Sequence, residues 1–435
     1  MNIIILVASL LILALVIVNP KIGVYLIAAS LPVIGRDVYI YGLIIPVADL
    51  AALLTLLGFL INLAFTSLFS PKHKLKISWP LFFPFFLFLS ASAISVIFSD
   101  NVSNSLYYFL RWPVFLYFAY IFVPANIIKD TKVLKWAVIL IFLSSMGVLL
   151  SGYLSLIDQD WQNVFFRMKS LYFLKSYPFG ENHNLIAEFL NIGAFFVLVI
   201  KEFLKDAREK RIADLLFFAT ALGVILTFSR TGWIILFLQS VVYIFYRLRD
   251  NNKEKLAVVV VVVLMLGFLS PLFWKMSVLQ DSNVSSTENR LLLTEIARDA
   301  FNERPLTGYG SGEFISLVND NIRFRTKYGA PVDSHGVLQK VAAENGIFGL
   351  LSWLFLFIYL VRFSIIAIKK YYPRIKWVLP FALASLGGLF FQLFNTSYYK
   401  GKVWFPIILF ILAVKFSDER YAKKHKNIAH PAKLG

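Results

Sequence analysis

Two residues in the second half of the chain are of types that could act on a phosphorylated substrate. Arg230 stands in 228-FSRTGW-233, and a guanidinium suits a phosphate because its planar fork donates two parallel hydrogen bonds. His335 stands in 333-DSHGV-337, where Asp333 or Glu344 could orient its ring. A histidine with a pKa near neutrality can take a proton from a hydroxyl. The alternatives are an arginine that snorkels to a membrane interface and a solvated loop histidine.

Other polar features indicate less chemistry. The glycines of 308-GYGSGEF-314 match neither phosphate-loop spacing and predict a turn between helices. Asp49, Arg111 and Glu188 fall in apolar segments but form no chain of carboxylates that could relay protons, which disfavours a transporter. The chain has no cysteine, so disulfides and thiolate metal sites are excluded.

The elements that must position these residues are membrane helices. Of the 435 residues, 59% are hydrophobic and 16% are charged, whereas soluble domains carry about a quarter charged residues. Apolar runs of the length that crosses a bilayer recur along the chain. Because hydrocarbon offers backbone groups no partner, these runs should be helices. The net charge of +18 fits basic loops beside a membrane and predicts no nucleic-acid partner.

We therefore expect an all-α polytopic integral membrane protein with about twelve or thirteen transmembrane helices. The apolar segments lie near 3–18, 22–34, 41–65, 79–98, 105–124, 134–152, 184–200, 212–228, 231–246, 256–272, 347–368, 377–396 and 403–415. The first lacks the basic region of a cleaved signal peptide and should be a retained helix. The expected domains are a transmembrane bundle (1–272, with a shorter outer segment at 153–183), a large helical outer loop (273–346), C-terminal transmembrane helices (347–415) and a basic tail (416–435).

Lysine and arginine gather in alternate connections between these segments. The clusters lie near 72–76, 129–135, 201–211, 247–255 and 369–376 and in the tail from Lys415. The positive-inside rule places these clusters and the C-terminus in the cytoplasm, so 153–183 and 273–346 face outward. The side of the N-terminus depends on whether there are twelve or thirteen spans, and the sequence leaves it open.

The order of motifs resembles the O-antigen ligase and polymerase superfamily of bacterial envelope glycosyltransferases. An outward SRTG between two late spans is followed by Arg-x-x-Leu, by Pro-Leu-x-Gly-x-Gly, and by a histidine before L-x-x-x-A-A-E-x-G-I-x-G-L. The resemblance covers about 180–355 in sequence and the earlier part only in topology. It implies a GT-C-like fold in the bacterial inner membrane, with the active site and the large loop on the periplasmic side.

The resemblance also implies a reaction and its residues. A glycan passes from undecaprenyl diphosphate to an acceptor hydroxyl in the periplasm, without nucleotide sugar, ATP, metal or another cofactor. His335 would be catalytic, and Arg230 and Arg290 would bind the diphosphate. Further candidates for substrate contact are Asn182, His183 and Asn184, which fill the place of an Asn-rich stretch in the family, and Arg167 and Tyr309.

Three functions remain open at this stage. An O-antigen ligase would use lipid A–core as acceptor, and this is the reading we favour. A polymerase would use the same donor with a lipid-linked repeat unit, and Gly336, where ligases often carry Asn, leaves that choice undecided. A lipid or polysaccharide transporter would explain the spans but not the concentration of polar residues in an outer loop.

Overall fold

The computed structural model describes residues 3–35, 37–40, 43–69, 77–157, 159, 167–173, 175–248, 281–394 and 400–429, and within them it is almost entirely helical. The N-terminal part holds α1 (Ile3–Val18), α2 (Pro20–Ser30), β1 (Asp37–Ile40), β2 (Leu43–Pro46), α3 (Val47–Phe69), α4 (Phe82–Ile97), α5 (Val102–Phe109), the π-helical stretches η1 (Leu110–Val114) and η2 (Tyr117–Phe122), α6 (Val123–Ile127) and α7 (Thr131–Ile157). The remainder holds α8 (His183–Phe203), α9 (Ala207–Leu226), α10 (Arg230–Arg247), α12 (Asp281–Glu303), α13 (Phe314–Asp320), α14 (Ile322–Tyr328), α15 (Val337–Tyr371), α16 (Val378–Phe391) and α17 (Gly401–Ala429).

The predicted all-α polytopic membrane protein is confirmed. Five described helical segments are long and apolar enough to cross a membrane: Val47–Phe69, Val102–Ile127, Thr131–Ile157, His183–Phe203 and Val337–Tyr371. Three shorter ones are also apolar: Ile5–Val18, Phe82–Ile97 and Val378–Phe391. The other predicted spans coincide with α2, α9, α10 and α17, except 256–272, which lies outside the described residues. The total of about twelve or thirteen spans stays a prediction.

One predicted boundary is wrong. The segment expected as a helix from residue 41 begins with β2, which pairs antiparallel with β1, and α3 starts only at Val47. Pro46 gives the physical reason, because a proline disfavours helical backbone at the residue before it and cannot donate a helical hydrogen bond. The β-branched residues ahead of it suit a strand.

The outward-facing side chains of the long helices are apolar. Leu57 and Leu60 of α3, Leu143 and Leu150 of α7 and Ile358 of α15 are all exposed, as expected where lipid covers the surface. Polar groups are instead paired inside the bundle. Lys402 Nζ of α17 lies 2.5 Å from Glu188 Oε2 of α8, and both side chains are almost fully buried. The pair joins two helices where neither charge would be stable alone.

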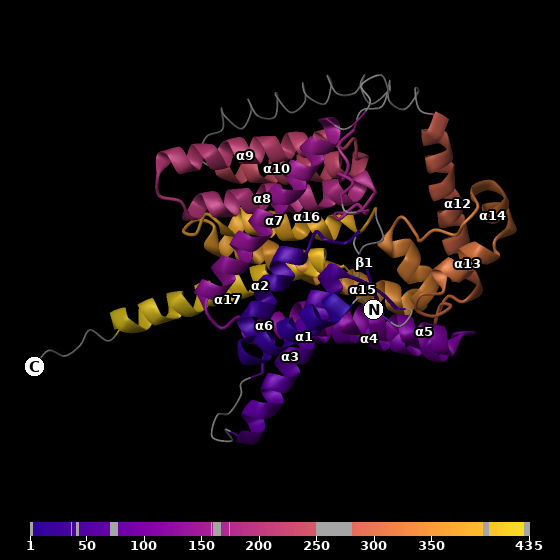
Figure 1. Cartoon of the computed structure of the whole chain (residues 1–435), viewed down its shortest axis with the longest axis horizontal. Helices are drawn as coiled ribbons and strands as arrows, with labels where there is room; N and C mark the ends of the chain where they lie inside the picture. The colour runs from indigo at the N-terminus through magenta and orange to yellow at the C-terminus, as the bar shows by residue number, and fades with distance from the viewer. Residues whose placement is uncertain are drawn as a thin grey trace, which may run out of the picture.

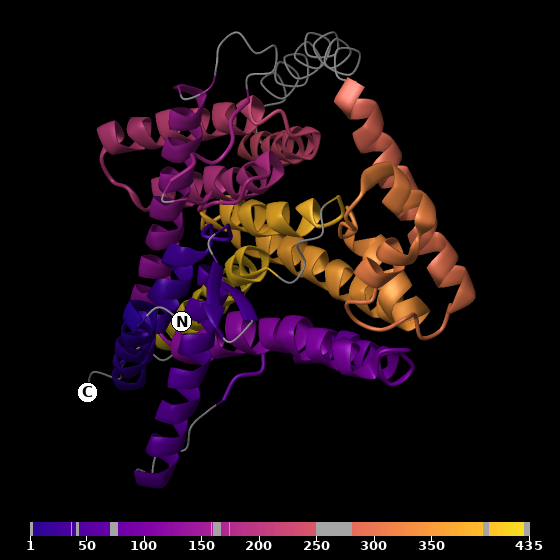
Figure 2. The same ribbon diagram turned by 45° about the vertical axis from the view of Figure 1, so that its right-hand side comes forward.

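Helices α12 to α14 form a lobe beside the membrane bundle. Figures 1 and 2 show this lobe at one side of the molecule, beyond α15 and the α4–α5 pair, while α8, α9, α10 and α16 lie side by side elsewhere. The lobe has its own core, which includes Leu292, Ile296 and Ala300 of α12, as their helical spacing predicts. The described part of the segment 273–346 therefore contains helices, as expected, and its first residues lie outside the described ranges.

A glycine-rich turn joins the lobe to a kink in α15. Tyr309 N donates to Ala343 O at 3.0 Å, and Gly310 N donates to Glu344 O at 2.9 Å. Gly308 and Gly346 both have positive φ, and the kink in α15 is at Gly346. The predicted turn therefore has a packing role, because its backbone lies directly against the backbone of α15.

Gly346→Ala should destabilise the protein. A Cβ at Gly346 would meet Leu306 O at 2.5 Å, and a φ of 61° is unfavourable for alanine, which together should cost about 1–3 kcal/mol or more. Gly147→Ala in α7 is the matched control, because its Cβ meets nothing within 4 Å. Thermal unfolding in detergent should show a lower Tm only for the first variant. Equal Tm values would contradict the packing described for the turn.

Candidate active site

The first turns of α8 and α10 lie together, and capping side chains hold them there. Asn182 caps α8 by accepting a hydrogen bond from Asn184 N at 2.8 Å. Ser229 caps α10 by accepting from Gly232 N at 3.2 Å, and its hydroxyl donates to Asn184 Oδ1 at 2.6 Å. Two helix N-termini therefore meet at one place. Their free N–H groups and dipoles favour an anion there.

Two arginines approach this place from different elements. Arg230 is the first residue of α10 and is exposed, whereas Arg290 is half-buried on α12. The Nε of Arg290 is buried and has no hydrogen-bond partner within the described part of the chain. Burial and the charge of Arg230 lower the pKa of Arg290, so the two cations repel each other. A bound anion would relieve both the repulsion and the unsatisfied donor.

His335 stands in the connection between α14 and α15, where the charge of Arg290 acts on it. Its imidazole is half-buried. Burial and the positive charge of Arg290 lower the pKa of His335 below its usual value, and Asp333 partly opposes that shift. This shift favours the neutral ring, which is the state that can accept a proton.

The segment between α7 and α8 adds a third arginine. Arg167 and Arg290 both act electrostatically on His183, the first residue of α8. Gln159 fixes the backbone of Arg167 by accepting from its N–H at 3.2 Å and donating to its carbonyl at 2.8 Å. The next residue, Met168, donates its N–H to Leu226 O, at the end of α9. Arg167 thus lies near the turn that carries Arg230.

The structure brings together all but one of the residues expected from the sequence. The exception is Tyr309, whose hydroxyl donates to Glu303 at the far end of α12 and whose ring lies 4.3 Å from the guanidinium carbon of Arg304. Glu303 is more than three turns beyond Arg290, or roughly 20 Å along the helix. Tyr309 contributes to the packing of the lobe, which gives no support to its predicted contact with substrate.

Hydrogen bonds that could not be predicted from the sequence link the backbone of Arg290 to the segment that carries His335. Gln339 Nε2 of α15 donates to Thr294 Oγ1 at 2.7 Å, and Thr294 Oγ1 donates to Arg290 O at 2.7 Å. The Ser334 hydroxyl lies 3.2 Å from Gln339 Oε1 and 2.7 Å from Gly336 O. One polar chain therefore runs from the turn of α12 that carries Arg290 to both neighbours of His335.

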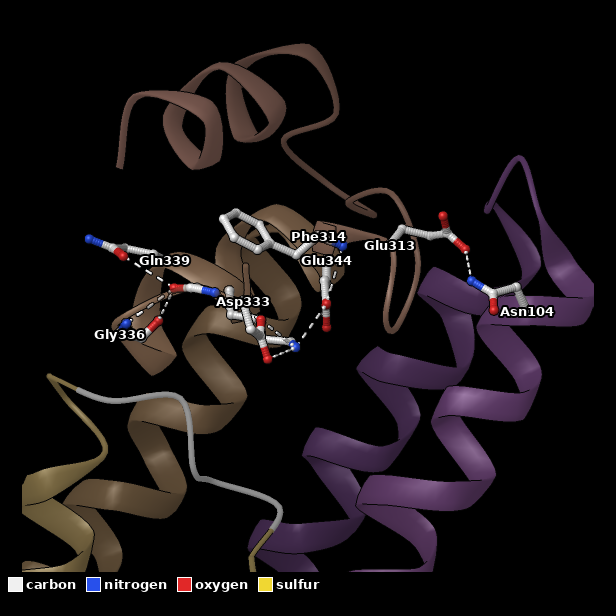
Figure 3. A network of polar contacts seen from close by, with 9 residues as sticks. Asn104, Glu313, Phe314, Asp333, Gly336, Gln339 and Glu344 are labelled. Carbon is white, nitrogen blue, oxygen red and sulfur yellow. Dashed lines mark hydrogen bonds and ion pairs between the residues drawn. The ribbon is translucent and has the colours of Figure 1, made fainter. Parts of the chain in front are cut away.

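Lys340 is a second feature that sequence reasoning missed. Its ammonium lies between Asp333 and Glu344, the two residues expected to orient His335, and Figure 3 shows this network between the start of α15 and the lobe. The four-residue spacing of Lys340 and Glu344 on one helix was the available signal. Within the described residues no group of three or more His, Asp or Glu side chains gathers in a way that could hold a metal ion.

Comparison with known proteins finds a similar family for part of the chain. Residues 215–354 match a family model described as O-antigen ligase. The match includes Arg230, Arg290 and His335, whereas Arg167 and 182–184 precede it. No curated protein matches the chain. The similarity to the O-antigen ligase family spans residues 215–354, and it supports the superfamily that the motifs indicated.

Proposed function

We propose that the chain is an inverting glycosyltransferase that moves a glycan from a polyprenyl-diphosphate donor, in bacteria undecaprenyl diphosphate, to a sugar hydroxyl. One observation carries the proposal: a half-buried histidine lies in the electrostatic field of Arg290, whose buried Nε lacks a partner in the described residues and whose positive charge repels that of Arg230. A cationic site next to a base is what transfer from a diphosphate leaving group requires.

Arg230 and Arg290 bind the diphosphate in the proposed mechanism, and the first turns of α8 and α10 add their N–H groups. A diphosphate leaves well once its charge is neutralised, and guanidinium groups can supply that charge in place of a divalent cation. His183 and Arg167 line the same region and are candidates for contact with the phosphates or the first sugar. The polyprenyl tail would extend between the apolar helices towards lipid.

His335 acts on the acceptor. Its imidazole takes the proton of the attacking hydroxyl as the oxygen forms a bond to the anomeric carbon. The bond from that carbon to the phosphate oxygen breaks, and polyprenyl diphosphate departs with the electron pair. Direct attack from the opposite side inverts the anomeric carbon. The proton on His335 then returns to solvent or to the released diphosphate.

The helix ends support a periplasmic site. Helices α8, α10 and α15 all begin near the candidate site and end with basic residues, Lys201, Arg247, and Lys369 with Lys370. Because basic residues favour the cytoplasmic side, the site would open to the periplasm of the inner membrane, and the C-terminal helix α17 would end in the cytoplasm.

The acceptor separates two versions of the proposal. We favour lipid A–core, which would make the protein a ligase, over a lipid-linked repeat unit, which would make it a polymerase. Lipopolysaccharide from a deletion strain, separated on a gel, tests both. Loss of every O-antigen-bearing band indicates a ligase, and retention of a single-repeat band indicates a polymerase. A ladder unchanged from the parent strain would contradict both versions.

A further inference from the structure

Lys340, near the start of α15, is a buried lysine whose charge is removed from water. Its side chain is 4% exposed, and its Nζ lies 2.8 Å from each carboxylate oxygen of Asp333 and 3.6 Å from Glu344 Oε1. Taking a charge out of water costs several kcal/mol, and a good pair only repays that cost. Well-packed apolar residues would stabilise the same position at least as well, so the charges have a use besides stability.

The bidentate contact fixes the segment that carries His335. Asp333 stands two residues before the histidine, and Lys340 stands in the first turns of α15 just after it. The Ser334 N–H donates to Asp333 Oδ1 at 2.8 Å, and the Val337 N–H donates to Gln392 O at 3.0 Å. The segment from Asp333 to Val337 is thereby held at both ends, with His335 between them.

Lys340 also sets how much negative charge His335 experiences. Glu344, 1% exposed, faces the same ammonium and accepts from the Phe314 N–H at 3.3 Å, which ties the pair to the lobe. The charged groups that act on the imidazole are Arg290 from α12 and Asp333 from its own segment. An ammonium in contact with both oxygens of Asp333 neutralises most of the field of that carboxylate.

We propose that Lys340 is a positioning residue for the transfer reaction: it clamps Asp333 beside His335 and neutralises that carboxylate, so that the imidazole stays an uncharged base next to the diphosphate site. The inference rests on the proposed function, because it takes His335 as the base. It adds a residue with no expected contact to the substrate.

Lys340→Met and Asp333→Asn test the clamp because they break the same contact from opposite sides. In Lys340→Met an unpaired carboxylate is left beside His335, and this negative charge favours the imidazolium. In a plot of kcat against pH, the fall in activity on the acidic side (the acidic limb) should therefore move to higher pH by roughly 0.5–1 unit. In Asp333→Asn the carboxylate is gone, so the limb should move down or stay in place. Both variants should lose kcat while the KM for donor changes little, since the arginines are untouched.

Two further variants guard against misfolding as the cause. Lys340→Arg keeps the charge and should restore the position of the limb. Asp100→Asn is the matched control, because it breaks the exposed pair between Asp100 and Arg304 (2.7 Å), which also ties the lobe to the bundle, and it should leave the profile unchanged. If Lys340→Met does not accumulate in membranes, the double variant with Asp333→Asn replaces it, and its limb should lie at or below that of the wild type.

Acidic limbs that move in the same direction in both single variants would overturn the inference. An unchanged limb in Lys340→Met would also overturn it, since the contact would then be only structural. A failure of the proposed function looks different. If His335 is not the base, any acidic limb of the wild-type pH profile should persist in His335→Gln. That result would not depend on Lys340.

Discussion

His335→Ala should reduce glycan transfer by about 10²–10⁴-fold, the range that a positioned general base contributes. The backbone on both sides of His335 is held by the Ser334 hydroxyl, which accepts from the Gly336 N–H at 3.1 Å and lies 2.7 Å from Gly336 O. Burial and the charge of Arg290 lower the pKa of the half-buried imidazole, which favours the neutral ring that accepts a proton. Initial rates with purified protein, or the amount of capped glycan in a complemented deletion strain, would measure the loss.

The dependence of wild-type activity on pH gives a second test of His335 as the base. A base must be neutral to work, so activity falls as the pH drops through the pKa of His335. Because that pKa is lowered, the acidic limb should lie below the usual histidine value of about 6.5. His335→Gln, which keeps a polar side chain of similar size, should be as inactive as His335→Ala while protein level and Tm stay near those of the wild type. Full activity in either variant would remove His335 from the mechanism.

Arg290→Gln should lower kcat/KM by about 10²–10³-fold, as expected when one preorganised donor to a developing negative charge is lost. The Nε of Arg290 is buried without a partner in the described residues, so the side chain is already in place for an anion. The same change removes a positive charge from the surroundings of His335. The pKa of the imidazole should therefore rise, and the acidic limb should move to higher pH.

Arg298→Gln is a matched control for this variant because it lies two turns further along α12. Its guanidinium is 67% exposed and pairs only weakly with the neighbouring Asp299 at 3.3 Å. We expect near wild-type activity and an unshifted limb. Arg290→Lys should recover part of the activity, since an ammonium keeps the charge but not the planar fork. Equal losses in Arg290→Gln and Arg298→Gln would point to the stability of the lobe rather than to the diphosphate.

Much of the fold could be predicted from the sequence because hydrocarbon leaves the chain few choices. An apolar run that crosses a bilayer must be a helix, so each predicted span in the described ranges coincides with helix over most of its length. The hairpin before α3 was missed because β-branched residues such as Ile44 and Ile45 are as apolar in a strand as in a helix. Hydropathy alone cannot separate the two.

The candidate site could be predicted only for residues whose side-chain type suggests a chemical role. Arg230 and His335 are of types that can bind a phosphate and accept a proton, and the order of motifs added Arg290. Lys340 and Thr294 could not be predicted in this way, because a lysine or a threonine on a helix has no distinctive role in the sequence alone. Their roles depend on tertiary contacts, of Lys340 with Asp333 and of Thr294 with Gln339. The structure gives no support to the prediction for Tyr309, because its neighbours in sequence, Gly308 and Gly310, pack against other parts of the chain, Gly308 against α15.

Purified protein incubated with an undecaprenyl-diphosphate-linked glycan and lipid A–core, without ATP and with a metal chelator, tests the central claim most directly. The account predicts a glycan–lipid A–core conjugate with an inverted anomeric linkage, and no conjugate with His335→Ala. In the polymerase version, a lipid-linked repeat unit as acceptor yields a longer lipid-linked chain instead. Movement of labelled glycolipid across a liposome membrane, with no new glycosidic product from either acceptor, would contradict the account and favour a transporter.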